Sequence, residues 1–140
     1  MIRPLGLKRP KLTRRQEQDA YDAATTRDLG KCQRCGFFGP VDRDHRQNRD
    51  AWNTVVSNLQ LLGSSRAVGG CGCHEWKTRN VAEAIETGFT VPKHGNPAEW
   101  PAYRIWDGWV IYYDEPDERG MWWRKLTEQE ARQILADLGV

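Results

Sequence analysis

The sequence predicts an α+β fold, in which helices flank two small antiparallel sheets. Two Thr-x-x-Gln/Glu capping boxes, beginning at Thr13 and Thr127, each mark the start of a helix. Between them, the pattern YRIW-DG-WVIYY over 103–113 is typical of a hairpin, because Asp107-Gly108 suits a type I′ turn between β-rich arms. Helices and hairpins therefore occupy separate parts of the chain, as in α+β proteins.

The remaining elements follow from local patterns of apolar, glycine and proline residues. A helix over about 14–28 should end at Gly30, and a later helix should run from Cys73 or His74 to Gly88. Short strands are expected over 39–46, 58–62 and 121–126, and a last helix over about 128–138.

Charge is unevenly distributed along the chain, although the net charge is only +2. Residues 1–50 hold 12 Lys or Arg against 7 Asp or Glu, whereas residues 81–140 hold 6 against 11. A basic front half suits phosphate binding, because each cation can displace a counterion from nucleic acid. We find no apolar run that could span a bilayer and no signal-peptide core, so we expect no membrane contact and a cytoplasmic location with reduced cysteines.

Four cysteines occur as two close pairs, Cys32-x2-Cys35 and Cys71-x-Cys73, separated by 35 residues. Paired thiolates of this kind are typical of a structural zinc site. Two sets of zinc ligands are consistent with these spacings. Either all four thiolates bind zinc, or His74, which has x2 spacing from Cys71, replaces Cys73.

Residues able to bind a metal or transfer a proton lie between and after the cysteine pairs. The order over residues 31–80 is CQRC…DRDH…NLQLL…CGCHEWKT. This series resembles the HNH endonuclease family, whose zinc-stapled members carry C-x2-C, Asp-His, Asn-Leu and C-x2-C-His-x2-Lys. The chain departs from that pattern in its C-x-C pair, in lacking a proline soon after Asp-His, and in the longer path GSSRAVGG before the last pair.

The resemblance implies a ββα-metal core with a zinc knuckle, and an enzyme that hydrolyses DNA phosphodiester bonds with Mg²⁺ or Mn²⁺. Asp44 and His74 would hold that cation, and Asn58 would brace the loop that carries the base. His45 suits the general base, because a neutral imidazole can accept a proton from water at neutral pH. With His74 on the catalytic cation, we expect all four thiolates on zinc.

The expected organisation has three parts: a flexible basic arm over 1–12, an HNH nuclease domain over 13–95, and a C-terminal β-meander plus helix over 96–140. The tryptophans of the last part are expected to form the core of its small sheet, and its acidic surface could dock another protein. The residues expected to contact DNA are Arg14, Arg15, Arg43, Arg46 and Lys77.

The chain is also similar to small phage-type HNH proteins encoded beside packaging motors. That similarity implies DNA as partner, a packaging motor or a second copy as a further partner, and the host cytoplasm as location. The alternative from another class is a non-catalytic, zinc-stabilised DNA-binding or packaging-associated adaptor module.

Overall fold

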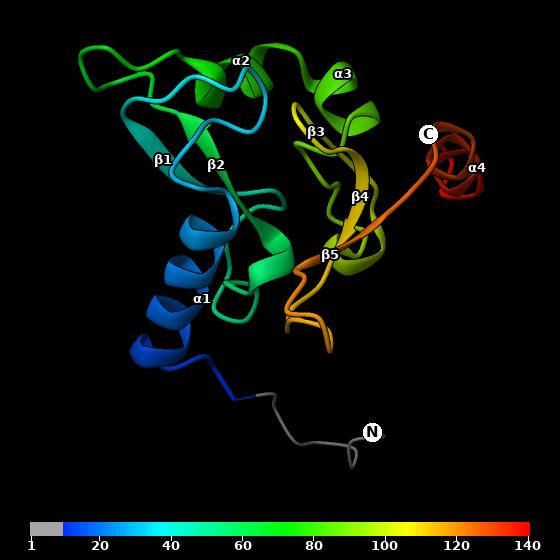
Figure 1. The fold of residues 1–140 in the computed structure, drawn as a ribbon, viewed down its shortest axis with the longest axis horizontal. Coiled ribbons are helices and arrows are strands. Elements are labelled where there is room, and N and C mark those ends of the chain that lie inside the picture. Colours follow the sequence, from blue (N-terminus) through cyan, green and yellow to red (C-terminus); the bar gives the residue numbers. More distant parts are fainter. Residues whose placement is uncertain (1–9) are drawn as a thin grey trace.

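The computed structural model describes residues 10–140 and has a mixed α+β fold (Figure 1). The first helix, α1 (Arg14–Arg27), begins at the predicted capping box, in which the Thr13 hydroxyl accepts from the backbone N–H of Gln16. Residues 1–9 of the predicted arm over 1–12 lie outside the described residues. At its end, the backbone N–H of Leu12 donates to the carbonyl of Ala51.

The strands β1 (Val41–His45) and β2 (Leu59–Gly63) form an antiparallel pair in which Asp44 lies opposite Gln60. Every residue of β2 is buried, because α1 packs against one part of the strand and α2 (Cys73–Arg79) against another. Asn58 does not begin this strand as predicted. It ends a short 3-10 helix, η1 (Val56–Asn58), directly before it.

The single helix predicted from Cys73 to Gly88 is instead two helices, α2 (Cys73–Arg79) and α3 (Val81–Glu86). The break lies at Asn80, whose side-chain amide donates to the carbonyl of Trp76 at 2.9 Å. Asparagine side chains compete with the helix for backbone hydrogen bonds, which accounts for the interruption here. No helix within residues 10–140 has the length and apolar character needed to cross a membrane.

The C-terminal sheet has the order β3 (Ala102–Arg104), β4 (Gly108–Tyr112), β5 (Trp123–Lys125), all antiparallel. The predicted two-residue turn at Asp107-Gly108 is wrong. Arg104 pairs with Gly108, so residues 105–107 form the connection. Strand β4 therefore begins at Gly108, which was predicted to belong to the turn. Asp107 stabilises this turn, because its backbone N–H donates to the carbonyl of Arg104 and its carboxylate accepts from the Arg104 guanidinium.

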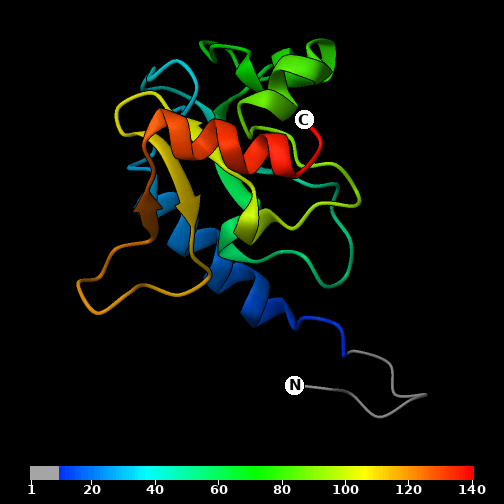
Figure 2. The same cartoon turned by 90° about the vertical axis from the view of Figure 1, so that its right-hand side faces the viewer.

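The last helix, α4 (Glu128–Asp137), begins at the predicted Thr127 capping box and covers the outer side of this sheet (Figures 1 and 2). Trp100, just after the short 3-10 helix η2 (Pro97–Glu99), is buried against Leu135 of α4. Of the predicted tryptophan core, only Trp100 is fully buried, and Trp109, Trp122 and Trp123 are half-buried. Trp106 is an exception, because it lies on the exposed β3–β4 turn.

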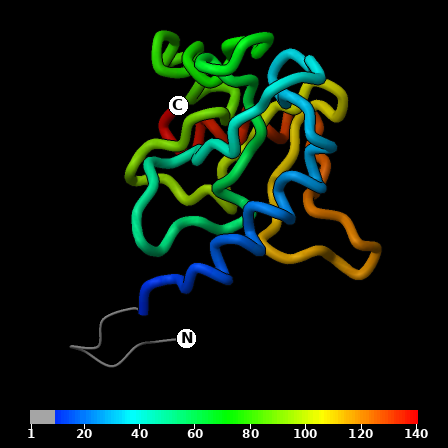
Figure 3. The backbone as a smooth tube through the Cα atoms, turned by 90° about the vertical axis from the view of Figure 1, so that its left-hand side faces the viewer, coloured from blue at the N-terminus to red at the C-terminus, as the bar shows by residue number. Residues whose placement is uncertain are grey.

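Buried arginines join the C-terminal part to the first half of the chain. The Asp28 carboxylate accepts from both Arg27 and Arg104, and all three side chains are almost fully buried. The β3–β4 turn also lies beside the cysteine-bearing segment (Figure 3), where the N–H of Ile105 donates to the carbonyl of Gln33.

Arg46 does not contact solvent, so the prediction that it binds DNA is wrong. The residue is only 1% exposed, and its guanidinium donates to four backbone carbonyls, of Ser57, Gly88, Pro97 and Trp100. Burial lowers the pKa of Arg46 to about 10, which still leaves the group charged at neutral pH. Arg46 therefore stabilises the junction between the two halves of the chain.

Candidate functional site

The four cysteines converge on one point between the segment after α1 and the start of α2. The sulfur atoms of Cys32, Cys35, Cys71 and Cys73 all lie within 4.8 Å of one another. In a tetrahedral zinc site with Zn–S bonds of about 2.3 Å, neighbouring sulfurs are about 3.8 Å apart. A modest contraction of the cluster would reach that spacing, so these cysteines could hold a structural metal such as zinc.

Two glycines make the tight Cys71-x-Cys73 spacing possible. Gly72, between the cysteines, has φ of 79°, a left-handed conformation that other residues rarely adopt, and it starts α2. Gly63, at the end of β2, lies so close to the Cys71 sulfur that a Cβ atom would collide with it. Gly63 therefore permits the close approach of the strand end to Cys71, and Gly72 permits the backbone turn that leads into α2.

The protein environment shifts the pKa values of Cys32 and Cys73 in opposite directions. Burial opposes ionisation of Cys32, but the backbone amides of Cys35, Gly63 and Arg34 bond to its sulfur and lower its pKa. Burial and the neighbouring thiols raise the pKa of Cys73, despite a 3.5 Å contact from Arg34. A bound divalent cation would deprotonate all such ligands, because the metal charge outweighs these local effects.

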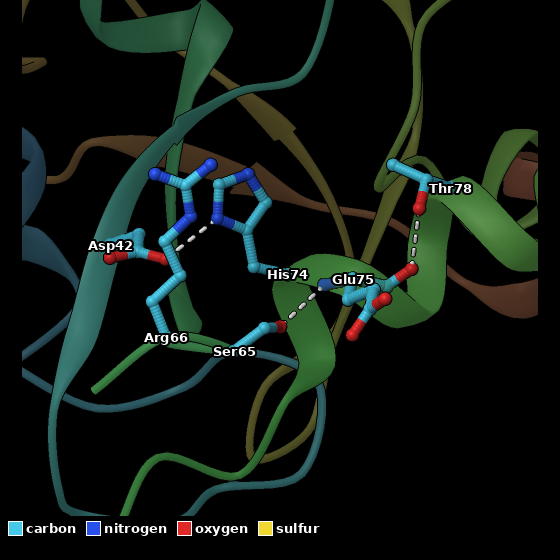
Figure 4. A pocket seen from close by; sticks show the side chains of 6 residues that line it. All are labelled: Asp42, Ser65, Arg66, His74, Glu75 and Thr78. Carbon is cyan, nitrogen blue, oxygen red and sulfur yellow. Dashed lines mark hydrogen bonds and ion pairs between the residues drawn. The ribbon is translucent and has the colours of Figure 1, made fainter. Parts of the chain in front are cut away.

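His74 lies away from the sulfur atoms and between two carboxylates of β1. Its Nδ1 is 2.7 Å from Asp42 Oδ2 (Figure 4), and its Nε2 is 3.0 Å from Asp44 Oδ1. Hydrogen bonds to Asp44 and then to Asp42 outweigh burial and raise the pKa of His74 to about 9. This geometry favours the four-thiolate set over the set that includes His74.

Asp44 is buried and held on its second oxygen by two further side chains. Its Oδ2 accepts from Gln60 Nε2 at 2.9 Å and from Lys77 Nζ at 2.6 Å. Burial opposes its ionisation, but the hydrogen bond from His74 and the charge of Lys77 hold its pKa below the usual range. Oδ2 is thus occupied by Gln60 and Lys77, while Oδ1 faces His74.

Lys77 faces the same way as His74, as its position on the helix predicts, but its ammonium group is not free. Besides Asp44, it donates to the backbone carbonyl of His45 at 2.8 Å, and its side chain is only 11% exposed. In this arrangement Lys77 orients Asp44 and the end of β1. Its predicted contact with a phosphate stays a prediction.

His45 points to the other face of β1, because neighbouring residues on a strand alternate. Its Nε2 lies 2.9 Å from the hydroxyl of Thr54, and its ring is nearly perpendicular to that of Tyr21 of α1, with the ring centres 6.0 Å apart. The tautomer that donates from Nε2 leaves Nδ1 able to accept a proton. Burial lowers the pKa of His45 below 6.5, which keeps the imidazole neutral at neutral pH. No hydrogen bond joins this ring to Asp44 or His74 in the described part of the chain.

Asn58 is fully buried and spans the loop that follows β1. Its Oδ1 accepts from the N–H of Gln47, and its Nδ2 donates to the carbonyls of Gln47 and Asn53. Removing this amide would leave several buried backbone groups without partners. These contacts brace the loop directly after His45.

The other predicted DNA contacts, Arg14, Arg15 and Arg43, are exposed. Arg43 lies over the ring of Tyr21, and Arg15 pairs with Asp19. All three are open to solvent on α1 and β1, in contrast to Arg46.

Three site residues were missed from the sequence: Asp42, Thr54 and Gln60. A signal existed for Asp42, because residues two apart on a strand share a face, so Asp42 accompanies Asp44 toward α2. Gln60 could be found only from the strand register, and Thr54 only from the folded loop.

Comparisons with protein-family models, with curated proteins and with solved structures found no match for this chain.

Proposed function

We propose that the chain is a DNA endonuclease of the HNH type that requires a divalent cation, Mg²⁺ or Mn²⁺. The observation that carries this proposal is the 3.0 Å approach of Asp44 Oδ1 and His74 Nε2, next to the Asp44-His45 strand end and the four-cysteine cluster. The order of strand, strand and helix that brings these atoms together supports the same proposal.

The two donor atoms fit a hard divalent cation. Adjacent ligands of an octahedral ion at about 2.1 Å are about 3 Å apart, which matches the separation of Asp44 Oδ1 and His74 Nε2. Asp42 would hold the proton of His74 on Nδ1 and so leave Nε2 available to the ion, as carboxylates beside metal-binding histidines commonly do. A bound cation would supply the positive charge that stabilises the developing charge on the phosphate.

The remaining residues have roles that follow from their contacts. His45, neutral and anchored through Nε2, would accept the proton of the attacking water at Nδ1. Lys77 and Gln60 would keep Oδ1 of Asp44 turned toward His74. Asn58 would hold the loop that follows His45 in place. The four cysteines would bind zinc and thereby fix the start of α2, from which His74 projects.

The test is cleavage of supercoiled plasmid by the full-length protein in Mg²⁺ or Mn²⁺, with EDTA as the metal-free reference. His45→Ala should lower the rate by about 10²–10⁴-fold, because the general base is lost. The matched control is His94→Ala, since His94 is an exposed histidine that packs its ring against Trp100. Equal cleavage by wild type and His45→Ala would rule out this role for His45.

A non-catalytic, zinc-stabilised DNA-binding module is the second candidate. The observation that favours it is the chain of contacts from Asp42 through His74 and Asp44 to Lys77, in which the polar groups satisfy one another without a cation. This candidate predicts DNA binding that is unchanged by EDTA and by His45→Ala, with no metal-dependent cleavage. Those results together would contradict the nuclease proposal and support the DNA-binding module.

A further inference from the structure

A hollow of about 610 Å³ lies beside His74, on the side of Asp42 (Figure 4). It is lined by Asp42, Ser65, Arg66, His74, Glu75 and Thr78. Its volume is in the range of small-ligand sites, which is about 300–1,000 Å³. We propose that this hollow receives a phosphodiester group of the nucleic acid, and that Arg66 is the side chain that binds it. The inference rests on the proposed function, and it names the substrate contact next to the cation-binding pair.

Arg66 belongs to the segment over residues 64–70, which connects β2 to α2. The hydroxyl of Ser64 accepts from the N–H groups of Arg66 and Ala67, and the hydroxyl of Ser65 accepts from the N–H of Glu75. The Ser64 bonds shape the segment locally, and the Ser65 bond ties it to the first turn of α2. The connecting segment is therefore anchored next to Arg66, which lines the hollow.

Arg66 differs from the other cations near the hollow in having no carboxylate partner within residues 10–140. Lys77 pairs with Asp44, and Arg79 pairs with Glu75 at 2.8 Å. The side chain of Arg66 extends toward the His74 imidazole in the view of Figure 4. An unpaired guanidinium beside a cation-binding pair suits a phosphate, because its fork of N–H donors matches phosphate oxygens.

Charge balance makes this binding depend on the divalent cation. In and beside the hollow, three carboxylates (Asp42, Asp44 and Glu75) face three cationic side chains (Arg66, Lys77 and Arg79). The charges of these six side chains cancel, so they give the hollow little attraction for a polyanion. A divalent cation on Asp44 and His74 would make the region positive by two charges, and Arg66 would then act beside it.

The experiment measures the affinity of the full-length protein for a short DNA duplex by fluorescence anisotropy, at several salt concentrations. His45→Ala serves as the background in Mg²⁺, so that the duplex stays intact. Arg66→Ala should bind more weakly, with a slope of log affinity against log salt that is shallower by about 0.9, as expected for one lost phosphate contact. Arg66→Lys should recover most of the slope, because the charge returns.

Arg132→Ala is the matched control, because Arg132 is an exposed arginine on α4 that is paired with Glu128. If Arg66→Ala and Arg132→Ala give the same affinity and slope, the inference is wrong. In EDTA the difference between Arg66→Ala and its background should shrink, and a difference that persists undiminished would contradict the charge argument.

The outcomes separate this inference from the proposed function. If the wild type cleaves plasmid and Arg66→Ala has an unchanged KM, the nuclease proposal stands and the phosphate site at Arg66 is wrong. If the wild type does not cleave plasmid but Arg66→Ala still has a shallower salt slope, the phosphate site stands and the nuclease proposal is wrong. A wild type that neither binds nor cleaves DNA would overturn both.

Discussion

At the scale of single residues, His74 follows Cys73 directly and yet takes part in a different cluster. Successive residues of a helix point about 100° apart, so Cys73 faces the sulfur atoms while His74 faces β1. There its two ring nitrogens meet Asp42 and Asp44. The first turn of α2 is therefore shared between a candidate structural metal and a candidate catalytic one.

Asp42 gives the sharpest prediction at this scale. Asp42→Asn removes the negative charge beside Nδ1 of His74, so we expect Mn²⁺ to bind about 10–100-fold more weakly, because such outer carboxylates orient the ligand and raise its basicity. Isothermal titration calorimetry on the zinc-loaded protein measures this directly. Asp19→Asn, which alters an exposed carboxylate on α1, is the control. An unchanged dissociation constant in Asp42→Asn would show that Asp42 does not support the ion.

At the scale of elements, the cysteine cluster joins the end of β2, the segment after α1 and the start of α2. The close approach at Gly63 and the left-handed backbone at Gly72 let these three pieces meet. The apolar side chains of Leu62, Ala84 and Phe89 pack beneath them. The sulfur cluster and this apolar group together determine where α2 begins.

Zinc content tests the ligand set. Cys73→Ser should lose the zinc, whereas His74→Ala should retain about one equivalent, as measured by elemental mass spectrometry of the purified proteins. Gly63→Ala should also lose zinc, because the added Cβ displaces the Cys71 sulfur. The reverse pattern, with zinc kept in Cys73→Ser and lost in His74→Ala, would establish the set of three thiolates and one imidazole.

At the scale of the whole molecule, the C-terminal sheet is joined to the first half of the chain by buried charge. Arg104 reaches Asp28 at 2.6 Å, and two of the four carbonyls held by Arg46 belong to Pro97 and Trp100. Buried groups of this kind are costly to leave without partners. The C-terminal part therefore supports the loop and strand that carry His45.

Arg46→Ala should accordingly lower the free energy of unfolding by at least about 3 kcal/mol, because four buried carbonyls lose their donor. Urea denaturation followed by tryptophan fluorescence measures the change. Arg15→Ala, at an exposed arginine on α1, should stay within about 0.5 kcal/mol of the wild type. Equal midpoints for the two variants would contradict the role assigned to Arg46.

Much of this protein could be predicted from short stretches of sequence. The capping boxes at Thr13 and Thr127 start helices as expected, and the two cysteine pairs converge as expected. The break at Asn80 and the shifted turn at Asp107 were not predicted. In both cases a side chain bonds to a nearby group and changes the local hydrogen bonding.

The sequence by itself determined where the first and last helices begin and which part of the chain forms each sheet, because these depend on neighbours within about four positions. Only the tertiary structure decided which charges are buried and which are free. Arg46 and Arg66 are alike as residues, but partners 11 to 54 positions away bury Arg46, while Arg66 lines the hollow beside His74 and has no carboxylate partner among residues 10–140. Long-range packing sets the solvation of a charged side chain, and with it whether the side chain stabilises the fold or is free to bind a ligand.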